Sequence, residues 1–201
     1  MLLCSFPKPD EKRPSLLQHN EIVLLFHELG HCIHDLACTT TYARLHGPDG
    51  TALDFSEAPS QLLEYWFWTP SVLKTIGRHY SYLNPEFLQT WKDKTGSSGD
   101  QPPERLPDDT VAKLVTTKHV NAAIPTLRQL AISVFDMEMH SNKPPEDLAN
   151  LEVSKEYNKI RRNLCQLEDL SDLGKGYGSG HGWAIYPHLM HGYDAGFYSY
   201  L

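Results

Sequence analysis

The sequence FHELGHCIH at residues 26–34 restricts what this chain can form more than any other feature. His27 and His31 are four residues apart, so on a helix turning about 100° per residue both imidazoles leave the same face and can reach one metal ion. Glu28 projects from the neighbouring face, where it can accept a proton from a water molecule on the metal. This pattern is typical of zinc-dependent hydrolases.

The residues around this motif predict a long apolar helix from about Glu21 to Ala37, with Asn20 available as its N-cap. His34 follows His27 by seven residues and falls on the same face, so it is expected to line a metal site without being a ligand. The alternative to a metal site is a buried helix whose histidines form hydrogen bonds within the core.

Composition narrows the classes of partner. The formal charge is −7 and no run is rich in Lys or Arg, which argues against a nucleic-acid binder. No apolar stretch approaches the length of a membrane span, and the N-terminus lacks the basic region of a signal peptide. The four cysteines (Cys4, Cys32, Cys38 and Cys165) form no paired pattern, so we expect free thiols in a reducing compartment.

The remaining pattern predicts a mainly α chain. Residues 1–15 contain three prolines and are expected to be irregular, and residues 39–55 are rich in turn-forming residues. The expected helices run from near Ser56 to Trp66, with Pro59 in the first turn, and from Pro70 to about His79–Tyr80. Residues 93–107 have the composition of a flexible surface insertion, which extends over about 82–107.

The C-terminal half is expected to hold two further helical segments. One runs from Asp108 to about His140 with a kink or break at Pro125, and the other follows Pro145 and ends near Leu167. Five glycines between Gly174 and Gly182 predict a mobile loop.

A zinc ion held by two histidines needs a third protein ligand and an open position. The acidic residues within reach downstream are Asp35, Asp54, Glu57 and Glu64. Glu57 opens the second predicted helix, which could pack across the first and present its carboxylate. Asp54 and Glu64 are then candidates to hold the imidazole N–H groups, although a solvated helix face explains Glu64 equally well.

Six blocks occur in this chain in the order known from one family. They are FPKP (6–9), LLQHNE (16–21), HELGHCIH (27–34), DFSEAPSQLLEYW (54–66), TLRQ (126–129) and HLMHGYDAGFYSYL (188–201). The sequence resembles the catalytic region of the thimet oligopeptidase, neurolysin and saccharolysin family of zinc metallopeptidases. The resemblance covers nearly the whole chain and leaves 82–107 as an apparent insertion.

The resemblance implies one zinc ion bound by His27, His31 and Glu57, with Glu28 as the catalytic base. It also implies that His188, Tyr193 and Tyr200 contact the substrate and the tetrahedral oxyanion, beneath a glycine loop that covers the substrate. Two positions depart from the family pattern: Phe197 replaces a tyrosine, and His191 replaces a small residue.

The function implied is that of a zinc metalloendopeptidase, in which Glu28 assists attack by a zinc-bound water on short oligopeptides. Family members also have an upstream helical domain and helices beyond the last tyrosine, so we expect residues 1–201 to be a partial catalytic domain, truncated at both ends. A catalytically inactive remnant that binds zinc or peptide is the alternative, and an unrelated helical scaffold is a third. The expected compartment is the cytoplasm, or the mitochondrion if a transit peptide precedes the chain.

Overall fold

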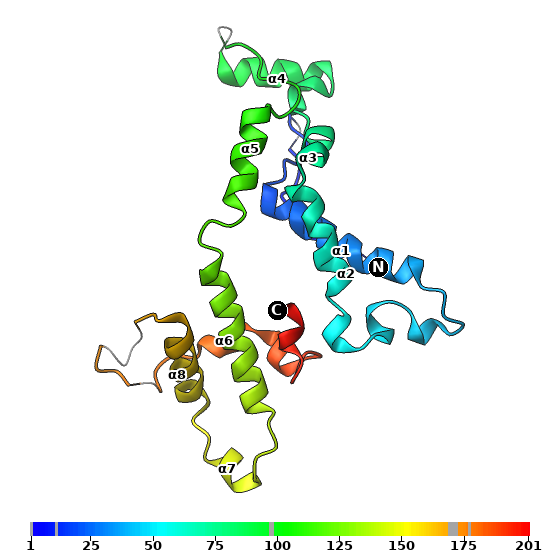
Figure 1. Cartoon of the computed structure of the whole chain (residues 1–201). Helices are drawn as coiled ribbons and strands as arrows, with labels where there is room; N and C mark the ends of the chain where they lie inside the picture. The colour runs from blue at the N-terminus through cyan, green and yellow to red at the C-terminus, as the bar shows by residue number, and fades with distance from the viewer. Residues whose placement is uncertain (1, 11, 97–98, 169–172, 177) are drawn as a thin grey trace. The chain divides into compact units, whose positions relative to one another are not determined.

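A computed structural model describes residues 2–10, 12–96, 99–168, 173–176 and 178–201, which are mainly helical, as predicted. The α-helices are α1 (His19–Ala37), α2 (Ala58–Glu64), α3 (Pro70–Ile76), α4 (Pro85–Thr95), α5 (Asp108–Thr117), α6 (Ala123–Met139), α7 (Pro145–Ala149) and α8 (Val153–Cys165) (Figure 1). Short 3₁₀ segments lie at Ala43–Leu45, Pro48–Gly50, Leu53–Phe55, Tyr65–Trp68, Tyr80–Tyr82, Gly182–Ile185, Pro187–Met190 and Phe197–Tyr200. The described part contains no β-strand, only an isolated bridge between Asp10 and Arg13.

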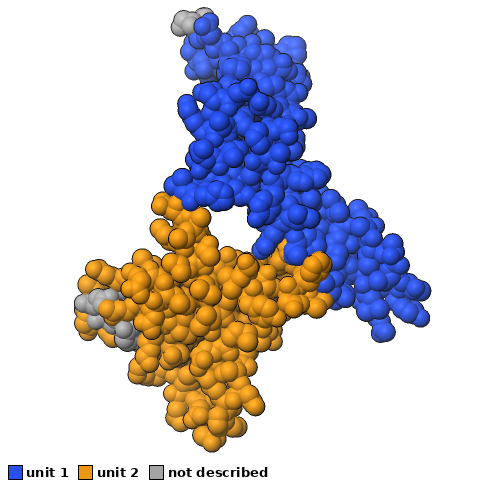
Figure 2. Space-filling view, viewed as in Figure 1, with its two compact units in different colours: residues 1–51, 58–120 blue, residues 52–57, 121–201 orange. Residues whose placement is uncertain are grey.

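The chain divides into two compact units, coloured separately in Figure 2. The first comprises residues 1–51 and 58–120, and the second comprises residues 52–57 and 121–201. None of the described helices is both long enough and apolar enough to cross a membrane. All four cysteines are free, as the sequence predicted.

Helix α1 begins two residues earlier than predicted, because Gln18 and Glu21 form a capping interaction at its N-terminus. The N-cap is Gln18, whose backbone N–H donates to the Glu21 carboxylate over 2.6 Å. A carboxylate at this position satisfies a backbone donor that the helix itself leaves free. Asn20, predicted as the N-cap, lies inside the helix, so that prediction is wrong.

Helices α1 and α2 pack against each other at Gly30, the buried residue of α1. A Cβ atom on Gly30 would lie 2.4 Å from the Ser60 Cα and 2.6 Å from the Pro59 carbonyl oxygen. Ser60 is itself fully buried. The two backbones therefore approach so closely that only glycine fits at residue 30.

An apolar core supports this pair within the first unit. Phe67, Leu73 and Val111 are buried there. Apolar side chains of α1 pack on this core, namely Ile22, Val23 and Phe26. Helix α1 is thus covered on one side by this core, which is formed by the 3₁₀ segment Tyr65–Trp68, α3 and α5, and it contacts α2 through Gly30.

Two elements of the first unit differ from the sequence analysis. The third predicted helix ends at Ile76 rather than near His79–Tyr80, because Gly77 adopts an extended conformation and caps it. Helix α4 was not predicted, and it lies inside the segment interpreted as an insertion. Its start is nonetheless encoded locally, since the Asn84 side chain accepts a hydrogen bond from the Phe87 N–H over 2.7 Å and Pro85 occupies the first turn. Residues 97–98 of that segment lie outside the described residues.

In the second unit, α6 and α8 pack together. The helix predicted from Asp108 to His140 is broken as expected, but the break lies at residues 118–122, so that Pro125 occupies the first turn of α6. The helix predicted after Pro145 forms as two pieces, α7 and α8. The described residues between Leu173 and His181 form no helix, and Tyr177 and residues 169–172 of the glycine-loop region lie outside the described set.

The core of the second unit consists of buried side chains from α6, α8 and the C-terminal segment. They are Ile132, Phe135, Tyr157, Leu189 and Phe197. The C-terminal segment is therefore anchored by apolar contacts on α6 and α8.

We predict that Gly30→Ala destabilises the protein by about 1–3 kcal/mol, because the added methyl group would overlap the α2 backbone. Alanine is intrinsically about 1 kcal/mol better than glycine inside a helix, so any net loss reports the clash. Denaturant-induced unfolding measures the change. Gly178→Ala is the control, since a Cβ there meets no atom within 4 Å. Equal stability of the two variants would show that α1 and α2 are not in tight contact.

Candidate functional site

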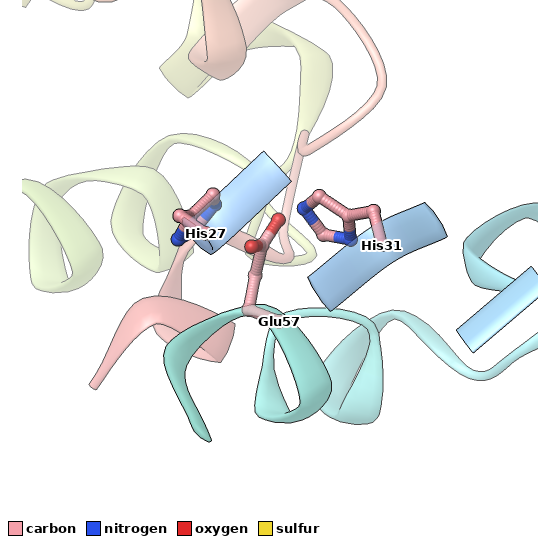
Figure 3. Close-up of side chains that lie close together, drawn as sticks. All are labelled: His27, His31 and Glu57. Atoms are coloured by element: carbon pink, nitrogen blue, oxygen red, sulfur yellow. The ribbon is translucent and has the colours of Figure 1, made fainter. Parts of the chain in front are cut away.

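The two histidines of the motif lie on one face of α1, as their spacing predicted, with ring centroids 5.1 Å apart. The Glu57 carboxylate points toward both imidazoles (Figure 3). Potential ligand atoms of His27, His31 and Glu57 all lie within 4.8 Å of one another. Glu57 is bonded directly to Ala58, the first residue of α2, so the helix packed on α1 begins next to this carboxylate.

The donor chemistry of this group suits zinc. Two imidazole nitrogens and one carboxylate oxygen are a ligand set that catalytic zinc sites use, with bonds of about 2.0–2.2 Å. Donors around one such ion lie within about 4 Å of one another, close to the 4.8 Å observed. Glu57 is only 2% exposed, so its carboxylate needs a partner of opposite charge or hydrogen-bond donors.

Glu64, at the end of α2, explains how His27 is oriented. Its Oε1 lies 2.7 Å from the Nδ1 of His27. An imidazole that donates its Nδ1–H to a carboxylate presents its Nε2 lone pair to a metal, and the carboxylate makes that nitrogen a stronger donor. The structure therefore places Glu64 in the supporting position that the sequence left open.

The other acidic candidates lie elsewhere. Asp35 and Asp54 are exposed and are not in the group of potential metal ligands found among the described residues. His34 is also outside this group, and its Nε2 lies 3.3 Å from the Thr51 hydroxyl. Of the four acids considered from the sequence, Glu57 and Glu64 are the two that the structure brings to the histidines.

Glu28 follows His27 on α1 and is partly exposed. No hydrogen bond or ion pair joins it to any described residue. Both oxygens of its carboxylate are thus available to a water molecule or a substrate.

In the second unit, the C-terminal segment gathers three aromatic residues of the predicted site. The ring centroid of His188 lies 5.6 Å from that of Tyr193 and 6.1 Å from that of Tyr200, and the two tyrosine rings are 5.2 Å apart. The Tyr193 hydroxyl donates a hydrogen bond to the Glu57 carboxylate.

Both tyrosines keep their protons at neutral pH. Burial raises the pKa of Tyr193, and its hydrogen bond to the Glu57 carboxylate raises that pKa further. The pKa of Tyr200 is also raised, chiefly by burial and then by its hydrogen bond with Tyr193. Each hydroxyl is therefore a hydrogen-bond donor, as stabilisation of a negatively charged oxygen requires.

The two departures from the family pattern have different surroundings. Phe197 is buried in the core of the second unit, where its ring lies 5.1 Å from that of Tyr200 and an unpaired hydroxyl would be unfavourable. His191 is exposed. Asp136, a fully buried acid on α6 that accepts hydrogen bonds from the backbone of this segment, was not among the residues predicted for the site. The signal that the sequence offers for Asp136 is an acidic residue directly after the mostly apolar residues 130–135.

The whole chain, residues 1–201, matches Peptidase family M3. It is 40% identical over 201 residues to saccharolysin of Saccharomyces cerevisiae, covering 24% of that protein. It is 33% identical over 204 residues to oligopeptidase PhomG of Diaporthe leptostromiformis, covering 28% of it. It is 31% identical over 205 residues to oligopeptidase A of Escherichia coli, covering 25% of it. All of this chain is included in each match.

The chain thus spans about a quarter of the length of these relatives. The family match, in contrast, leaves no part of the 201 residues uncovered and includes both the histidine motif and the C-terminal tyrosines. The chain belongs to Peptidase family M3.

Proposed function

We propose that this chain is the zinc-binding catalytic part of a metalloendopeptidase that cleaves short oligopeptides. The observation that supports this most directly is the group of His27, His31 and Glu57, with potential ligand atoms within 4.8 Å of one another. Membership of a peptidase family and similarity to proteins named oligopeptidases support the reaction and the class of substrate. Four free thiols favour a reducing compartment, and we propose the cytoplasm.

The ligands proposed for the metal are His27, His31 and Glu57. When bound, zinc would supply a Lewis acid that lowers the pKa of water and polarises a peptide carbonyl. Glu64 would fix the His27 ring through the Nδ1 contact of 2.7 Å.

The proton transfers fall to Glu28. Its carboxylate, which no described residue engages, would take up the proton of the attacking water and then deliver it to the nitrogen of the leaving amine. Tyr200, assisted by Tyr193, would donate its hydroxyl hydrogen to the oxyanion that develops on the carbonyl oxygen. His188, in the same aromatic cluster, would contact the peptide.

We predict that the protein binds one zinc ion per chain and that His27→Ala and Glu57→Ala each abolish this binding, because each removes one of three protein ligands. Elemental analysis after dialysis measures the zinc-to-protein ratio. Glu146→Ala, which changes an exposed acid on α7, is the matched control. Undiminished zinc in the Glu57 variant would mean that another residue is the third ligand.

We predict that Glu28→Gln retains zinc but lowers hydrolysis of a short quenched fluorescent peptide by more than tenfold. Glutamine preserves shape and hydrogen bonding but cannot take up a proton. If the variant kept a tenth or more of the activity, the loss would be below ~1.4 kcal/mol and Glu28 could not be the base. An unaltered chain that holds zinc without cleaving peptides would instead support the inactive, zinc-binding alternative.

We predict that Glu64→Gln weakens zinc binding by about 10–100-fold, because the His27 ring loses its anionic partner while the ligand atoms stay in place. Competition with a chelator of known affinity measures the change. Glu86→Gln, an exposed acid at the start of α4, should bind zinc as the unaltered chain does. Equal affinities in the two variants would assign Glu64 to structure alone.

A further inference from the structure

Asp136 on α6 is fully buried, yet it has no role in the mechanism proposed above. Its Oδ1 accepts a hydrogen bond from the Ala195 backbone N–H over 3.1 Å, and its Oδ2 accepts one from the Phe197 N–H over 3.0 Å. The Nδ1 of His140, the C-cap residue of α6, lies 2.9 Å from the same Oδ1 and is hydrogen-bonded over 3.0 Å to the backbone oxygen of Asp136. Two backbone N–H groups thus donate to one carboxylate, and an imidazole lies beside it.

The backbone turn held by these hydrogen bonds has an unusual conformation. Ala195 has φ +58°, in the left-handed region that residues with a side chain seldom adopt. Two backbone N–H groups two residues apart converge on one anion, as in the backbone nests that bind anions. A carboxylate in the protein interior compensates for its lost hydration with such donors. The carboxylate and the turn therefore stabilise each other.

The turn lies between the two tyrosines of the proposed site. Ala195 follows Tyr193 by two residues, and Phe197 precedes Tyr200 by three. The Phe197 side chain is buried among apolar residues of α6 and α8, and its backbone is bonded to Asp136. The segment from Tyr193 to Tyr200 is consequently held by the apolar contacts of the Phe197 side chain and by hydrogen bonds from its main chain to Asp136.

Gly196, in the same turn, lies in close contact with Leu53. A Cβ at this position would lie 2.0 Å from the Cδ2 of Leu53, four residues before Glu57. The turn therefore packs against the segment that carries Glu57, to which the Tyr193 hydroxyl donates a hydrogen bond. Small displacements of the turn would move that hydroxyl relative to the carboxylate.

We propose that Asp136 is a positioning residue, which holds the turn at residues 195–197 so that the hydroxyls of Tyr193 and Tyr200 lie where the reaction needs them. It acts through these tyrosines and does not touch the substrate. The catalytic consequence rests on the proposed function, whereas the placement of the tyrosines can be measured without any activity.

The main test is Asp136→Asn, which keeps one acceptor oxygen but sets an NH₂ group against a backbone N–H. Glu138→Gln is the matched control, because it makes the same change on the same helix at a partly exposed side chain that pairs with Lys143. Each chain carries 3-fluorotyrosine at residue 193 or, in a second sample, at residue 200. Circular dichroism and zinc content are compared first.

The expected result is that ¹⁹F resonances of both tyrosines shift in Asp136→Asn and stay in place in Glu138→Gln. In the non-fluorinated proteins, kcat for a short peptide should fall at least tenfold in Asp136→Asn while KM changes less than about threefold. In a Tyr200→Phe background the same substitution should lower kcat less than threefold, since a residue that acts through Tyr200 has little left to affect. A purely structural residue would give the same loss in both backgrounds.

Unchanged ¹⁹F resonances in folded Asp136→Asn would overturn the proposal, as would a loss of kcat that is equal with and without Tyr200. If the unaltered chain cleaves no peptide, the proposed function fails, and the ¹⁹F comparison alone decides whether Asp136 positions the tyrosines. If Asp136→Asn does not fold, His140→Ala replaces it. That variant removes the imidazole that lies 2.9 Å from the carboxylate and should shift the same resonances by a smaller amount, and no shift would overturn the proposal.

Discussion

The close approach of α1 and α2 at Gly30 and Ser60 is the contact on which the proposed metal site depends. Gly30 lies three residues after His27 and directly before His31. Ser60 lies three residues after Glu57 and four before Glu64. The contact is therefore flanked in sequence by the two histidines on α1 and by the two acids at the ends of α2. Because side chains three or four residues apart share a helix face, His27 and His31 leave α1 together and Glu64 leaves α2 on the face of Ser60, while Glu57 directly precedes α2.

Buried carboxylates connect the rest of the structure. Glu57 and Asp136 are both almost inaccessible to solvent, and each receives hydrogen bonds from the C-terminal segment, from the Tyr193 hydroxyl and from two backbone N–H groups respectively. Removing the donors of a buried charge is far more costly than breaking an exposed pair such as Lys113 with Asp109. The two acids therefore constrain residues 193–200 more strongly than the exposed ion pairs do.

Local features of the fold could be predicted from the sequence, and the reason is visible in particular residues. The periodicity around the motif is enough to predict α1, and turn-forming residues locate the loop before α2. The exact start of α1 was missed because Glu21, rather than Asn20, satisfies the first free backbone donor. Helix α4 was missed because its charged, weakly apolar sequence outweighed the Asn84–Pro85 start signal.

In the candidate site, too, sequence predicts the residues that are close along the chain better than those brought together by packing. Spacing alone places His27 and His31 together, whereas the position of Glu57 at the start of the second predicted helix made it one candidate among four acids, which the family resemblance then selected. From the sequence, Glu64 could equally have been a solvated residue, because only the packing of α2 determines which way it points. Asp136 gave even less signal, since its partners Ala195 and Phe197 are 59 and 61 residues away.

These separations suggest how the site is assembled. Its proposed metal ligands and Glu64 come from residues 27–64 and depend on two helices that are neighbours in sequence. The tyrosines depend on contacts that close much longer loops, 136 residues in the case of Tyr193 and Glu57. Ordering a longer loop costs more conformational entropy, though the cost grows only slowly with length. A buried carboxylate that accepts hydrogen bonds from two backbone N–H groups offsets part of that cost, because charge-assisted hydrogen bonds are about twice as strong as neutral ones. Asp136 lies in sequence between the proposed ligands and the tyrosines. This position fits a division in which helix packing positions the proposed metal ligands and a buried carboxylate positions the proposed oxyanion donors, Tyr193 and Tyr200.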